Sequence, residues 1–351
     1  MKLVADIFGG DNSPIETVAG AVEAINEQKD LSLILTGDET LINDELKKYE
    51  YDKQRIEVVH APEVISCNES PTTAIKRKKD SSLVVAYGLL KEREDVKGLV
   101  SAGSTGAVLA GGILKLGRIK GVSRPALAPV LPALVDGEEK GNVLLIDCGA
   151  NVDCKPVNLL HFALMGSIYM NKLYGIEKPR VALLSNGVED AKGCALTKEA
   201  FTMLKDCPNI NFVGNMEARD IISGKYDVVV SDGFYGNICL KSLEAVADGM
   251  MSIFKKSIMS SFRQKIGFMF MKPAFKKLKN TMDYNKKGGA VFLGVEKIVV
   301  KAHGSSKRAA FKNAILQAMR ASESGVSDII KQEITTMVAA DASETADKEQ
   351  A

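Results

Sequence analysis

Apolar runs typical of buried strands alternate with amphipathic runs typical of helices along most of this chain. Strands are predicted near residues 2–8, 31–36, 56–60, 98–102, 143–147, 180–184, 226–231 and 296–301. Such alternation is typical of parallel strands joined by helical crossovers. The pattern therefore predicts an α/β fold in which helices sandwich a mostly parallel sheet.

Five of the predicted strands end in small, polar, turn-forming residues. The five segments are VADIFGGD (4–11), LVSAGSTGA (99–107), LLIDCGAN (144–151), VVVSDGFYGN (228–237) and VVKAHGSS (299–306). In open α/β sheets the ligand binds outside the carboxyl ends of the strands, because loops there turn N–H groups and helix N-termini toward an anion. These segments predict an enzyme or binding protein for a phosphorylated or carboxylated molecule.

One segment interrupts the alternation. Residues 249–282 contain no acidic residue, eight basic ones, six of the 13 methionines and five of the 12 phenylalanines. Phe and Ile recur every four residues from 254 to 266, and Gly267 and Pro273 then bracket the apolar run FMFM. The pattern predicts a basic amphipathic helical hairpin over 247–283 with an apolar tip.

Two interpretations of this hairpin stay open. A Met and Phe stripe is often a dimer-forming or core helix pair. A basic surface without acidic residues also suits anionic lipid headgroups or an acidic protein. The candidate contacts with such a membrane or protein surface are Lys255, Arg263, Lys265, Phe268, Phe270, Lys272, Lys276 and Lys277.

The rest of the chain shows no internal repeat, flexible linker or domain boundary. We therefore expect a single α/β/α catalytic domain over residues 1–337, with the hairpin included. Residues 338–351 are small, polar and acidic, which predicts a disordered tail.

Composition narrows the class of protein. The 351 residues are 46% hydrophobic, which is ordinary for a globular chain, and the formal charge of +2 gives no global field for nucleic acid. The six cysteines form no C-x-x-C pair, and MKLVADI enters a predicted strand directly, without a signal peptide. No apolar stretch approaches the ~20 residues that span a bilayer. We expect a cytoplasmic protein without a nucleic-acid partner, for which any membrane contact is peripheral.

The turns GGD (9–11) and SAGSTGA (101–107) each follow a strand and precede a predicted helix. Gly9 and Gly10 allow backbone to approach a ligand closely, and Asp11 is expected to point into the site. SAGSTGA offers hydroxyl and N–H groups to phosphate, and its candidate residues are Ser101, Gly103, Thr105 and Gly106. The alternatives are a tight strand-to-helix turn and a Ser/Thr helix cap.

The segments DCGAN and DGFYGN repeat one order of residues, in which a buried strand is followed by Asp, Gly and Asn. Such an Asp orients neighbouring donors, and a side-chain amide such as Asn237 donates to a developing oxyanion. The other candidates in these segments are Asp147, Asn151, Asp232 and Gly236. The alternative interpretation is a pair of Asx-turns.

Two further turns carry candidate charges. In HGSS, His303 is expected to titrate, and Ser305 and Ser306 precede a helix N-terminus that binds anions; alternatively His303 is structural. In SNGVEDAKG (185–193), Glu189 and Lys192 lie three residues apart, on one helical face. A lysine binds phosphate as a point charge, and the alternative is a solvated ion pair.

Other chemistries leave no pattern in the sequence. The motifs of P-loops, serine hydrolases and zinc peptidases are missing, and His60, His161 and His303 lie far apart. We therefore expect no metal and no cofactor. An acyl-cysteine intermediate at Cys148 is an alternative mechanism, although such cysteines are usually small buried fillers.

Ten segments, in order from about residue 1 to 330, resemble the PlsX-type phosphate acyltransferases of bacterial phospholipid synthesis. They are DIFGGD, KRKKDSSL, SAGSTGA, RPALAP, DCGAN, G-x-E-x-x-K-G, SDGFYGN, LK-x-x-E, GGA-x-FLG and VVKAHGSS. The chain departs from the family pattern at Ser104, where Asn is usual, at DIFGGD, where DAMGGD is usual, and at Val188, where a second acid is frequent.

The resemblance implies a Rossmann-like three-layer α/β/α homodimer, related in fold to isopropylmalate dehydrogenases and phosphotransacetylases. It implies transfer of a fatty acyl group from acyl carrier protein to inorganic phosphate at the inner face of the cell membrane, where the acyl phosphate feeds glycerol-3-phosphate acylation. It also implies that the hairpin serves dimer packing, carrier docking and membrane contact.

The candidate residues support a mechanism without a general base. Phosphate is already partly dianionic near pH 7 and a thiolate leaves readily, so the protein has to supply orientation and oxyanion donors. The predicted catalytic residues are Lys192, as the cation facing phosphate or the leaving thiolate, and Asn237, as the oxyanion donor. The alternatives are a phosphate acetyl- or butyryltransferase using coenzyme A, an NAD-dependent dehydrogenase, and a non-enzymatic membrane-recruited scaffold or acyl-phosphate sensor.

Overall fold

The computed structural model describes residues 1–282 and 287–349, with side chains for 1–278 and 287–337. Its strands are β1 (Lys2–Asp6), β2 (Ser32–Gly37), β3 (Ile56–His60), β4 (Val96–Ser101), β5 (Ala126–Val135), β6 (Glu138–Ile146), β7 (Arg180–Ser185), β8 (Asn211–Glu217), β9 (Val228–Val230), β10 (Ala290–Leu293) and β11 (Ile298–Lys301). They form one sheet in the order β3-β2-β1-β4-β11-β10-β5-β6-β9-β7-β8.

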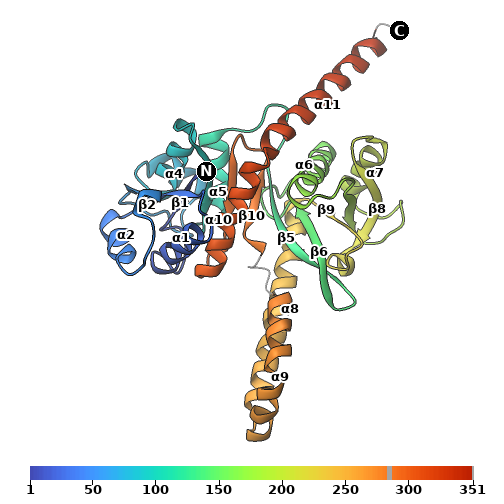
Figure 1. Ribbon diagram of the computed structural model, residues 1–351. Coiled ribbons are helices and arrows are strands. Elements are labelled where there is room, and N and C mark those ends of the chain that lie inside the picture. Colours follow the sequence, from blue (N-terminus) through green and yellow to red (C-terminus); the bar gives the residue numbers. More distant parts are fainter. Residues whose placement is uncertain (283–286, 350–351) are drawn as a thin grey trace.

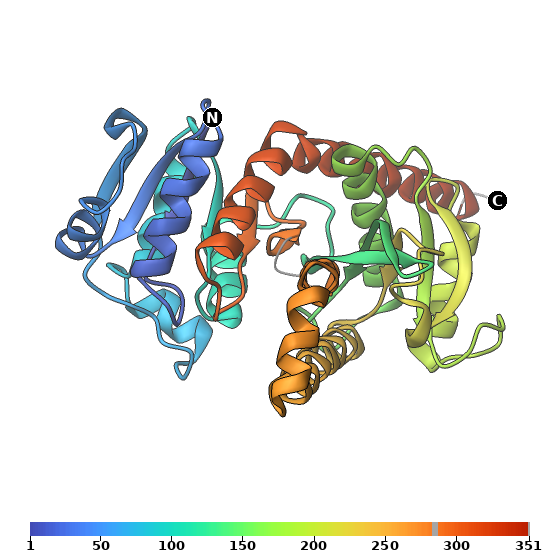
Figure 2. The same ribbon diagram turned by 60° about the horizontal axis from the view of Figure 1, so that its bottom comes forward.

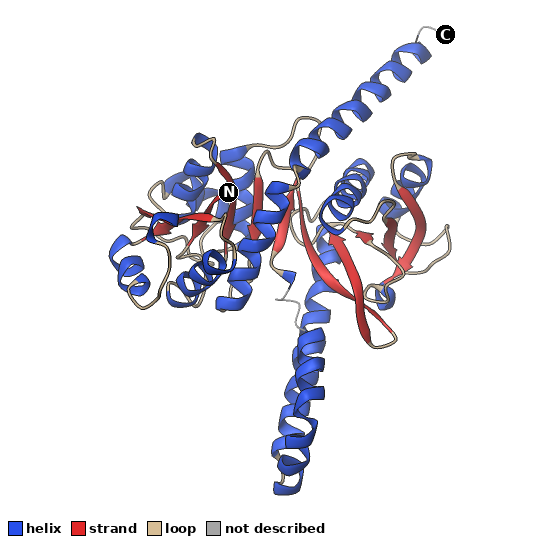
Figure 3. Cartoon of the chain, viewed as in Figure 1, coloured by secondary structure: helices blue, strands red, loops and turns tan. Residues whose placement is uncertain are grey.

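Helices cover both faces of this sheet (Figures 1 and 3). They are α1 (Ile15–Glu27), α2 (Glu39–Leu46), α3 (Pro71–Arg77), α4 (Ser82–Glu92), α5 (Thr105–Gly111), α6 (Pro156–Tyr174), α7 (Ala195–Asp206), α8 (Gly233–Met259), α9 (Phe262–Met282), α10 (Arg308–Glu323) and α11 (Val326–Glu349). Short single turns of helix lie at Lys53–Arg55, Gly112–Leu116 and Ala218–Asp220.

The sheet contains two groups of strands that run in opposite directions. β1, β2, β3, β4 and β11 are parallel to one another, and β6, β7, β8 and β9 form a second parallel group. Between the groups, β10 is antiparallel to both β11 and β5, and β5 is antiparallel to β6. The predicted mostly parallel α/β sheet between helices is confirmed, with an antiparallel centre that the sequence analysis did not include.

The two groups point toward each other across β10 and β5. β11 ends at Lys301, which pairs with Ala290 of β10, and Ala290 pairs with Pro129 of β5. The next residue of β5, Val130, pairs with Leu144 close to the end of β6. The carboxyl ends of β11 and β6 therefore approach each other near the middle of the sheet. A uniformly parallel sheet would instead place these turns along one edge.

Alternate residues of each strand pack on opposite faces, which explains the two helical layers (Figure 2). In β1, Leu3 belongs to the apolar cluster that contains Val18 of α1 and Phe311 of α10. Val4 belongs to a second cluster, which contains Leu83 of α4. Strands buried on both faces lose their alternation of polar residues, and this is why their apolar runs were recognisable in the sequence.

Three strands, β5, β8 and β10, lie where the sequence analysis predicted none. β5 contains Pro129 and Pro132, and a proline donates no backbone hydrogen bond, so a run with two prolines does not resemble a central strand. β8 contains Gly214 at φ +100, and β10 has only four residues. In each strand, pairing with neighbours outweighs weak local propensity.

The predicted helical hairpin is present as α8 and α9, which project together from the sheet as an arm (Figure 1). α8 begins at Gly233, directly after β9, and continues without interruption to Met259. The turn follows Met259, and α9 runs from Phe262 through Gly267 and Pro273. The predicted position of the tip, at FMFM between Gly267 and Pro273, was therefore wrong: this run lies within α9.

Aromatic packing keeps α9 against α8 across the proline. The ring of Phe275 lies 6.0 Å from that of Phe254 and 5.1 Å from that of Phe268. Lys277 of α9 pairs with Glu138 of β6 at 3.1 Å, so the arm also contacts the β5–β6 hairpin. Phe270 faces solvent and is 83% exposed. No helix in the described part of the chain combines the length and apolar character that crossing a bilayer requires.

The chain end is helical where the sequence analysis predicts a disordered tail. α11 continues to Glu349, so the structure corrects that prediction for residues 338–349. The segment contains four alanines and neither glycine nor proline up to Glu349, and alanine has the highest helix propensity. α11 points away from the sheet on the side opposite the arm (Figure 1).

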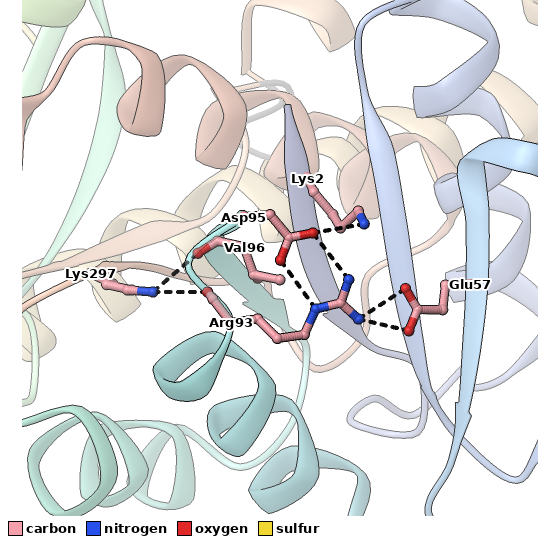
Figure 4. A network of polar contacts seen from close by, with 6 residues as sticks. All are labelled: Lys2, Glu57, Arg93, Asp95, Val96 and Lys297. Atoms are coloured by element: carbon pink, nitrogen blue, oxygen red, sulfur yellow. Dashed lines mark hydrogen bonds and ion pairs between the residues drawn. The ribbon is translucent and has the colours of Figure 1, made fainter.

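Charged residues at the amino ends of β1, β4 and β11 pair with one another (Figure 4). Arg93 donates to both carboxylate oxygens of Glu57, at 2.7 and 3.0 Å, and also contacts Asp95. Lys2 lies 2.8 Å from Asp95. Lys297, just before β11, donates to the backbone carbonyls of Arg93 and Val96. These contacts join β1, β3, β4 and β11 at this end of the sheet.

Candidate active site

The turns after β1, β4 and β11 are in direct contact. A Cβ atom on Gly9 would lie 2.7 Å from the backbone nitrogen of Gly103, so only glycine permits this approach. A Cβ on Gly10 would lie 3.1 Å from the carbonyl oxygen of Gly304. The N–H of Asp11 donates to the same carbonyl at 2.9 Å. The glycines thus bring these turns close to one another, whereas the sequence analysis assigned them to close approach of a ligand.

Two predicted phosphate ligands of the SAGSTGA turn are used inside the protein. Ser101 is fully buried, and its hydroxyl donates to Asp6 at 2.7 Å. The N–H of Gly103 donates to the Ser101 hydroxyl at 3.0 Å. Burial raises the pKa of Asp6, and one of its carboxylate oxygens has no partner within the described residues. Ser101 and Gly103 therefore shape the turn, and Thr105, which is exposed at the start of α5, is its residue that faces the pocket.

Asp147 organises the turn after β6 from inside. It is 0% exposed, and its carboxylate accepts hydrogen bonds from the N–H groups of Leu127 (2.8 Å), Ala150 (3.2 Å) and Asn151 (2.7 Å). The Asn151 amide also donates to Asp147 and to the carbonyl of Pro125. Burial raises the pKa of Asp147 to about 6. Asp147 and Asn151 therefore position backbone, as the Asx-turn interpretation expected, and their side chains are occupied by these contacts.

The first turn of α8 packs against this same loop. Asp232 caps the helix by accepting from the N–H of Tyr235 at 2.8 Å. A Cβ on Gly236 would lie 1.9 Å from the carbonyl oxygen of Asp147, so a larger residue would displace the helix. Asn237 follows directly and lies beside Gly149. The DGFYGN segment thus places the Asn237 amide next to the DCGAN turn.

These turns enclose a pocket of about 120 Å³. Its lining includes Thr105 after β4, Cys148 after β6, Asn237 and Lys241 of α8, and Lys301 and His303 at the end of β11. The lining also contains apolar residues, among them Leu127 and Val130, and the acid Glu244. A pocket of this size with several polar groups holds a few waters or a small anion. The structure therefore brings together, in one pocket, residues from four of the five predicted turns. The fifth turn, Gly9–Asp11, packs against the HGSS turn at Gly304.

Two lysines of this pocket were missed by the sequence analysis. Lys301 is 7% exposed, and its Nζ donates to the backbone carbonyls of Ala102 and Ala302. Burial lowers the pKa of Lys301 to about 8. Lys241 lies on α8 and pairs with Glu244 at 2.6 Å. A lysine at the end of a buried strand is unusual, so the position of Lys301 within VVKAHGSS was a signal that could have identified it. Lys241 belongs to the LK-x-x-E segment, which was used only for the family resemblance.

The remaining candidates near this pocket are His303, Ser305, Ser306 and Gly106, and most of them contact other residues of the protein. His303 contacts the Ser305 hydroxyl at 2.8 Å, and burial lowers the pKa of His303. Ser306 is buried, and its hydroxyl has no partner among the side chains that the structure describes. A Cβ on Gly106 would lie 2.5 Å from Pro71, so this glycine packs α5 against α3.

Cys148 is a poor nucleophile in this environment. Its thiol is 3% exposed and lies 3.7 Å from the carbonyl oxygen of Leu145. Burial, together with the charge of Asp147, raises its pKa well above the usual thiol value, and the thiolate is the reactive form. The structure favours the buried-filler interpretation over an acyl-cysteine intermediate. Among the described residues, His, Cys, Asp and Glu side chains form no cluster able to hold a metal ion.

Glu189 and Lys192 lie outside this pocket. They belong to the exposed loop between β7 and α7, where the N–H of Lys192 donates to the carbonyl of Glu189 at 3.0 Å. Both side chains pack beside Gly187. The next residue, Gly193, lines a second cavity, a groove of about 720 Å³ on the opposite flank of α8. Lys192 is therefore close to the groove and does not line the anion pocket.

The groove is mainly apolar. Its lining includes Leu184, Cys194, Tyr235, Ile238, Leu243 and Val246. Positions 237, 241 and 244 of α8 line the pocket, whereas positions 235, 238, 242 and 246 line the groove. A helix presents residues three and four apart on one face, so α8 separates the two cavities as a common wall.

Comparisons with known proteins identify the family and the fold. A family model described as "Fatty acid synthesis protein" matches residues 1–329. A phosphate acyltransferase of Clostridium tetani is 50% identical over 337 residues, covering 96% of this chain and 99% of the relative. One of Clostridium novyi is 52% identical over 334 residues, covering 95% and 98%. The fold resembles a phosphotransacetylase from Streptococcus pyogenes, with TM-score 0.59, 16% identity and coverage of 92% and 94%.

Proposed function

The chain belongs to the fatty acid synthesis protein family of phosphate acyltransferases, and on that premise we propose that its acyl donor is a fatty acyl thioester of acyl carrier protein. The products are acyl phosphate and free carrier protein. The observation that carries this proposal is the pairing of a small basic pocket and a large apolar groove on the two flanks of α8.

The two cavities suit the two substrates of this reaction. The pocket presents lysine, hydroxyl and amide donors, which match an inorganic oxyanion. The groove of about 720 Å³ is lined by aliphatic and aromatic side chains, which match a long hydrocarbon chain. Asn237 lines the pocket and the next residue of α8, Ile238, lines the groove. The proposal therefore places the thioester carbonyl at this turn of α8, with the acyl chain passing around the helix from the groove to the pocket.

The reaction then needs one displacement at the carbonyl carbon. A phosphate oxygen attacks the thioester carbonyl, the carbonyl oxygen becomes an oxyanion, and the Asn237 amide donates to it. When the C–S bond breaks, the electron pair leaves with the carrier's thiolate, which takes a proton from water. Lys192, beside the groove residue Gly193, supplies positive charge for this thiolate. Of its two predicted roles, this position favours the leaving group over phosphate.

The arm supports a carrier protein as donor. Up to position 278 its lysines and arginine are exposed, and it carries no acidic residue between positions 249 and 282, so its field attracts an acidic carrier surface. The exposed Phe270 and its apolar neighbours suit peripheral contact with the inner face of the cell membrane. The proposal also includes a homodimer in which the arms of the two subunits pack together. It places the reaction in bacterial phospholipid synthesis. Lys277 takes part less, because it already pairs with Glu138.

A direct comparison of donors tests the proposal. Hexadecanoyl thioesters of carrier protein and coenzyme A, and acetyl-coenzyme A, are each supplied with phosphate, and acyl phosphate is trapped with hydroxylamine. We expect kcat/KM for the carrier thioester to exceed that for hexadecanoyl-coenzyme A at least about tenfold at low salt, because charge steers association. The variant Lys272→Glu/Lys276→Glu is expected to lower this ratio, and Lys178→Glu, outside the arm, is the control.

Three results would contradict the proposal. Equal kcat/KM for the two hexadecanoyl donors would mean that the carrier is not recognised. A preference for acetyl-coenzyme A would favour the phosphate acetyl- or butyryltransferase alternative. Hydroxylamine also reacts directly with thioesters, so a reaction without enzyme is subtracted; enzyme-dependent hydroxamate that forms without phosphate would point to a different acyl acceptor.

A further inference from the structure

We propose that Lys301 and Lys241 together form the phosphate-binding site, with Lys301 at the floor of the pocket and Lys241 on its α8 wall. This inference rests on the proposed function, because it takes phosphate as the acyl acceptor. It transfers to two other lysines the phosphate-binding role that was one of two predicted for Lys192.

Lys301 is built as a fixed cation that lacks its anion. Its Nζ donates to two backbone carbonyls, of Ala102 and Ala302, which fix its position at the end of β11. It forms no ion pair among the residues that the structure describes. A buried ammonium ordinarily requires a countercharge. Asp6 and Asp11 act on Lys301 through their charge without forming an ion pair with it. Because the side chain lines the pocket, an anion bound there supplies the direct partner.

Lys241 reaches the same pocket from α8, the helix that follows β9 of the second parallel group. It lies one turn of helix beyond Asn237, on the same face of α8, and is held by Glu244 at 2.6 Å. Glu244 is only 13% exposed and lines the same pocket, so Lys241 keeps this contact. The ammonium of Lys241 has three N–H groups, and its exposed side donates to a phosphate oxygen while the pair with Glu244 stays in place. The charge of Lys241 is one of the interactions that disfavour the protonated form of Lys301. Two cations therefore face one pocket, and an anion bound there stabilises both.

Neutral donors complete the site. The hydroxyl of Thr105, the ring of His303 and the amide of Asn237 line the same pocket. Lys192 lies at the far flank of α8, next to the groove. A phosphate on Lys301 and Lys241 is therefore already beside the amide that receives the carbonyl oxygen, which is the arrangement that attack on the thioester requires.

The chain offers a matched control for Lys301. Lys297 lies just before β11 and Lys301 at its end, and each donates from Nζ to backbone carbonyls. Burial lowers the pKa of both. Lys297 lies beside Arg93 and Val96 at the amino end of the strand (Figure 4), and it does not line the pocket. Replacing either lysine by methionine removes one charge and its hydrogen bonds to backbone carbonyls. Only Lys301→Met also removes a cation of the proposed site.

The experiment measures phosphate binding in two ways. In the first, the melting temperature of the full-length protein is recorded with and without inorganic phosphate, with no acyl donor present. In the second, the KM values for phosphate and for the acyl donor are determined. We expect Lys301→Met and Lys241→Met each to raise the phosphate KM at least about tenfold, because each removes a charge-assisted hydrogen bond. The donor KM stays within about twofold, and the thermal shift by phosphate is reduced.

Conservative and control variants separate binding from folding. Lys297→Met is expected to lower the melting temperature and leave the phosphate KM unchanged. Lys301→Arg keeps the charge and is expected to retain part of the phosphate shift. If Lys301→Met fails to fold, Lys241→Met decides, because its side chain is exposed. Unchanged phosphate KM and unchanged thermal shift in the lysine variants would overturn the proposal.

The pH dependence gives a third readout. Lys301 with its pKa of about 8 is protonated at pH 7 and loses its charge above pH 8, so phosphate affinity should fall as pH rises through this range. The groups facing it are Cys67, Lys241, Asp6 and Asp11. Lys301→Arg should flatten this profile. The thermal shift needs no acyl donor, so a loss of phosphate binding in Lys301→Met supports this site even if carrier protein proves to be the wrong donor.

Discussion

The amino and carboxyl ends of β1, β4 and β11 differ in the partners that their charged side chains have. At the amino ends, Arg93 pairs with Glu57 and Asp95, and Lys2 completes the network at 2.8 Å from Asp95 (Figure 4). At the carboxyl ends, Lys301 has only carbonyl partners, and one oxygen of the buried Asp6 has none within the described residues. Lys297 at the amino end of β11 also has only carbonyl partners in the described chain, so this feature alone does not distinguish the ends. The same strands carry a network of ion pairs at one end, and at the other end a lysine that lines the pocket and a buried carboxylate without an ion-pair partner among the described residues.

The difference separates stability from function. Paired surface charges lower each other's energy and need nothing from outside the chain. Buried charges that lack a countercharge cost folding free energy, and they persist where a ligand supplies the partner. The comparison thus teaches that, in the part of this molecule that the structure describes, buried charge without an ion-pair partner adjoins the proposed substrate site, whereas the network of paired charges lies at the opposite end of the sheet.

The largest expected effect lies at the carboxyl end, in Asn237→Ala. Removing one oxyanion donor lowers kcat about 100- to 1000-fold in other enzymes, and we expect a loss in that range, measured by hydroxamate formation at saturating substrates. The amide makes no hydrogen bond inside the described chain, so the melting temperature should change little. A kcat within tenfold of the wild-type value, as an order-of-magnitude threshold, would show that another group stabilises the oxyanion.

Lys192→Ala is expected to have the next largest effect, and it tests whether all cations of the site act on phosphate. Loss of a charge-assisted contact with the leaving thiolate should lower kcat about tenfold to 100-fold. The phosphate KM and the thermal shift by phosphate should remain, since Lys192 does not line the pocket. A raised phosphate KM would place this lysine with Lys301 and blur the distinction between the two cavities.

The smallest effect is expected at the amino end. Arg93→Ala should leave kcat and both KM values within about twofold, because exposed ion pairs contribute little and lie far from the pocket. The melting temperature should fall slightly at pH 7. Arg93 and Lys2 hold the pKa of Asp95 below its usual range, so this stabilisation is present above the usual Asp pKa and is lost as pH falls through the lowered one. Thermal unfolding at pH 7 and in strong acid checks both statements.

The sequence was sufficient for the parts of the molecule that depend on local pattern. The apolar runs before Asp6, Ser101 and Lys301 predicted the strands and their turns, and ten short segments indicated the family. Pro129 and Pro132 hid β5, because its pairing depends on β10 and β6, which are distant in sequence. The antiparallel centre of the sheet could not be predicted without it.

The sequence predicted which turns form the site, but it did not predict which side chains in those turns are free to contact a ligand. Ser101 and Asp147 have the residue types of ligand-binding groups, and the structure buries both among backbone donors. Lys301 has the residue type of a surface group, and the structure buries it in the pocket. Burial depends on tertiary packing, which no single segment of the sequence records.

The unbroken course of α8 has a mechanical consequence. One helix of 27 residues carries Asn237 in its second turn and ends at Met259 in the arm, and a helix of that length is a stiff rod of roughly 40 Å. No joint separates the oxyanion donor from the far end of the arm. A partner that docks there and rotates the rod would turn the Asn237 amide with it, so under the proposed function capture of the carrier and alignment of the reacting groups are a single motion.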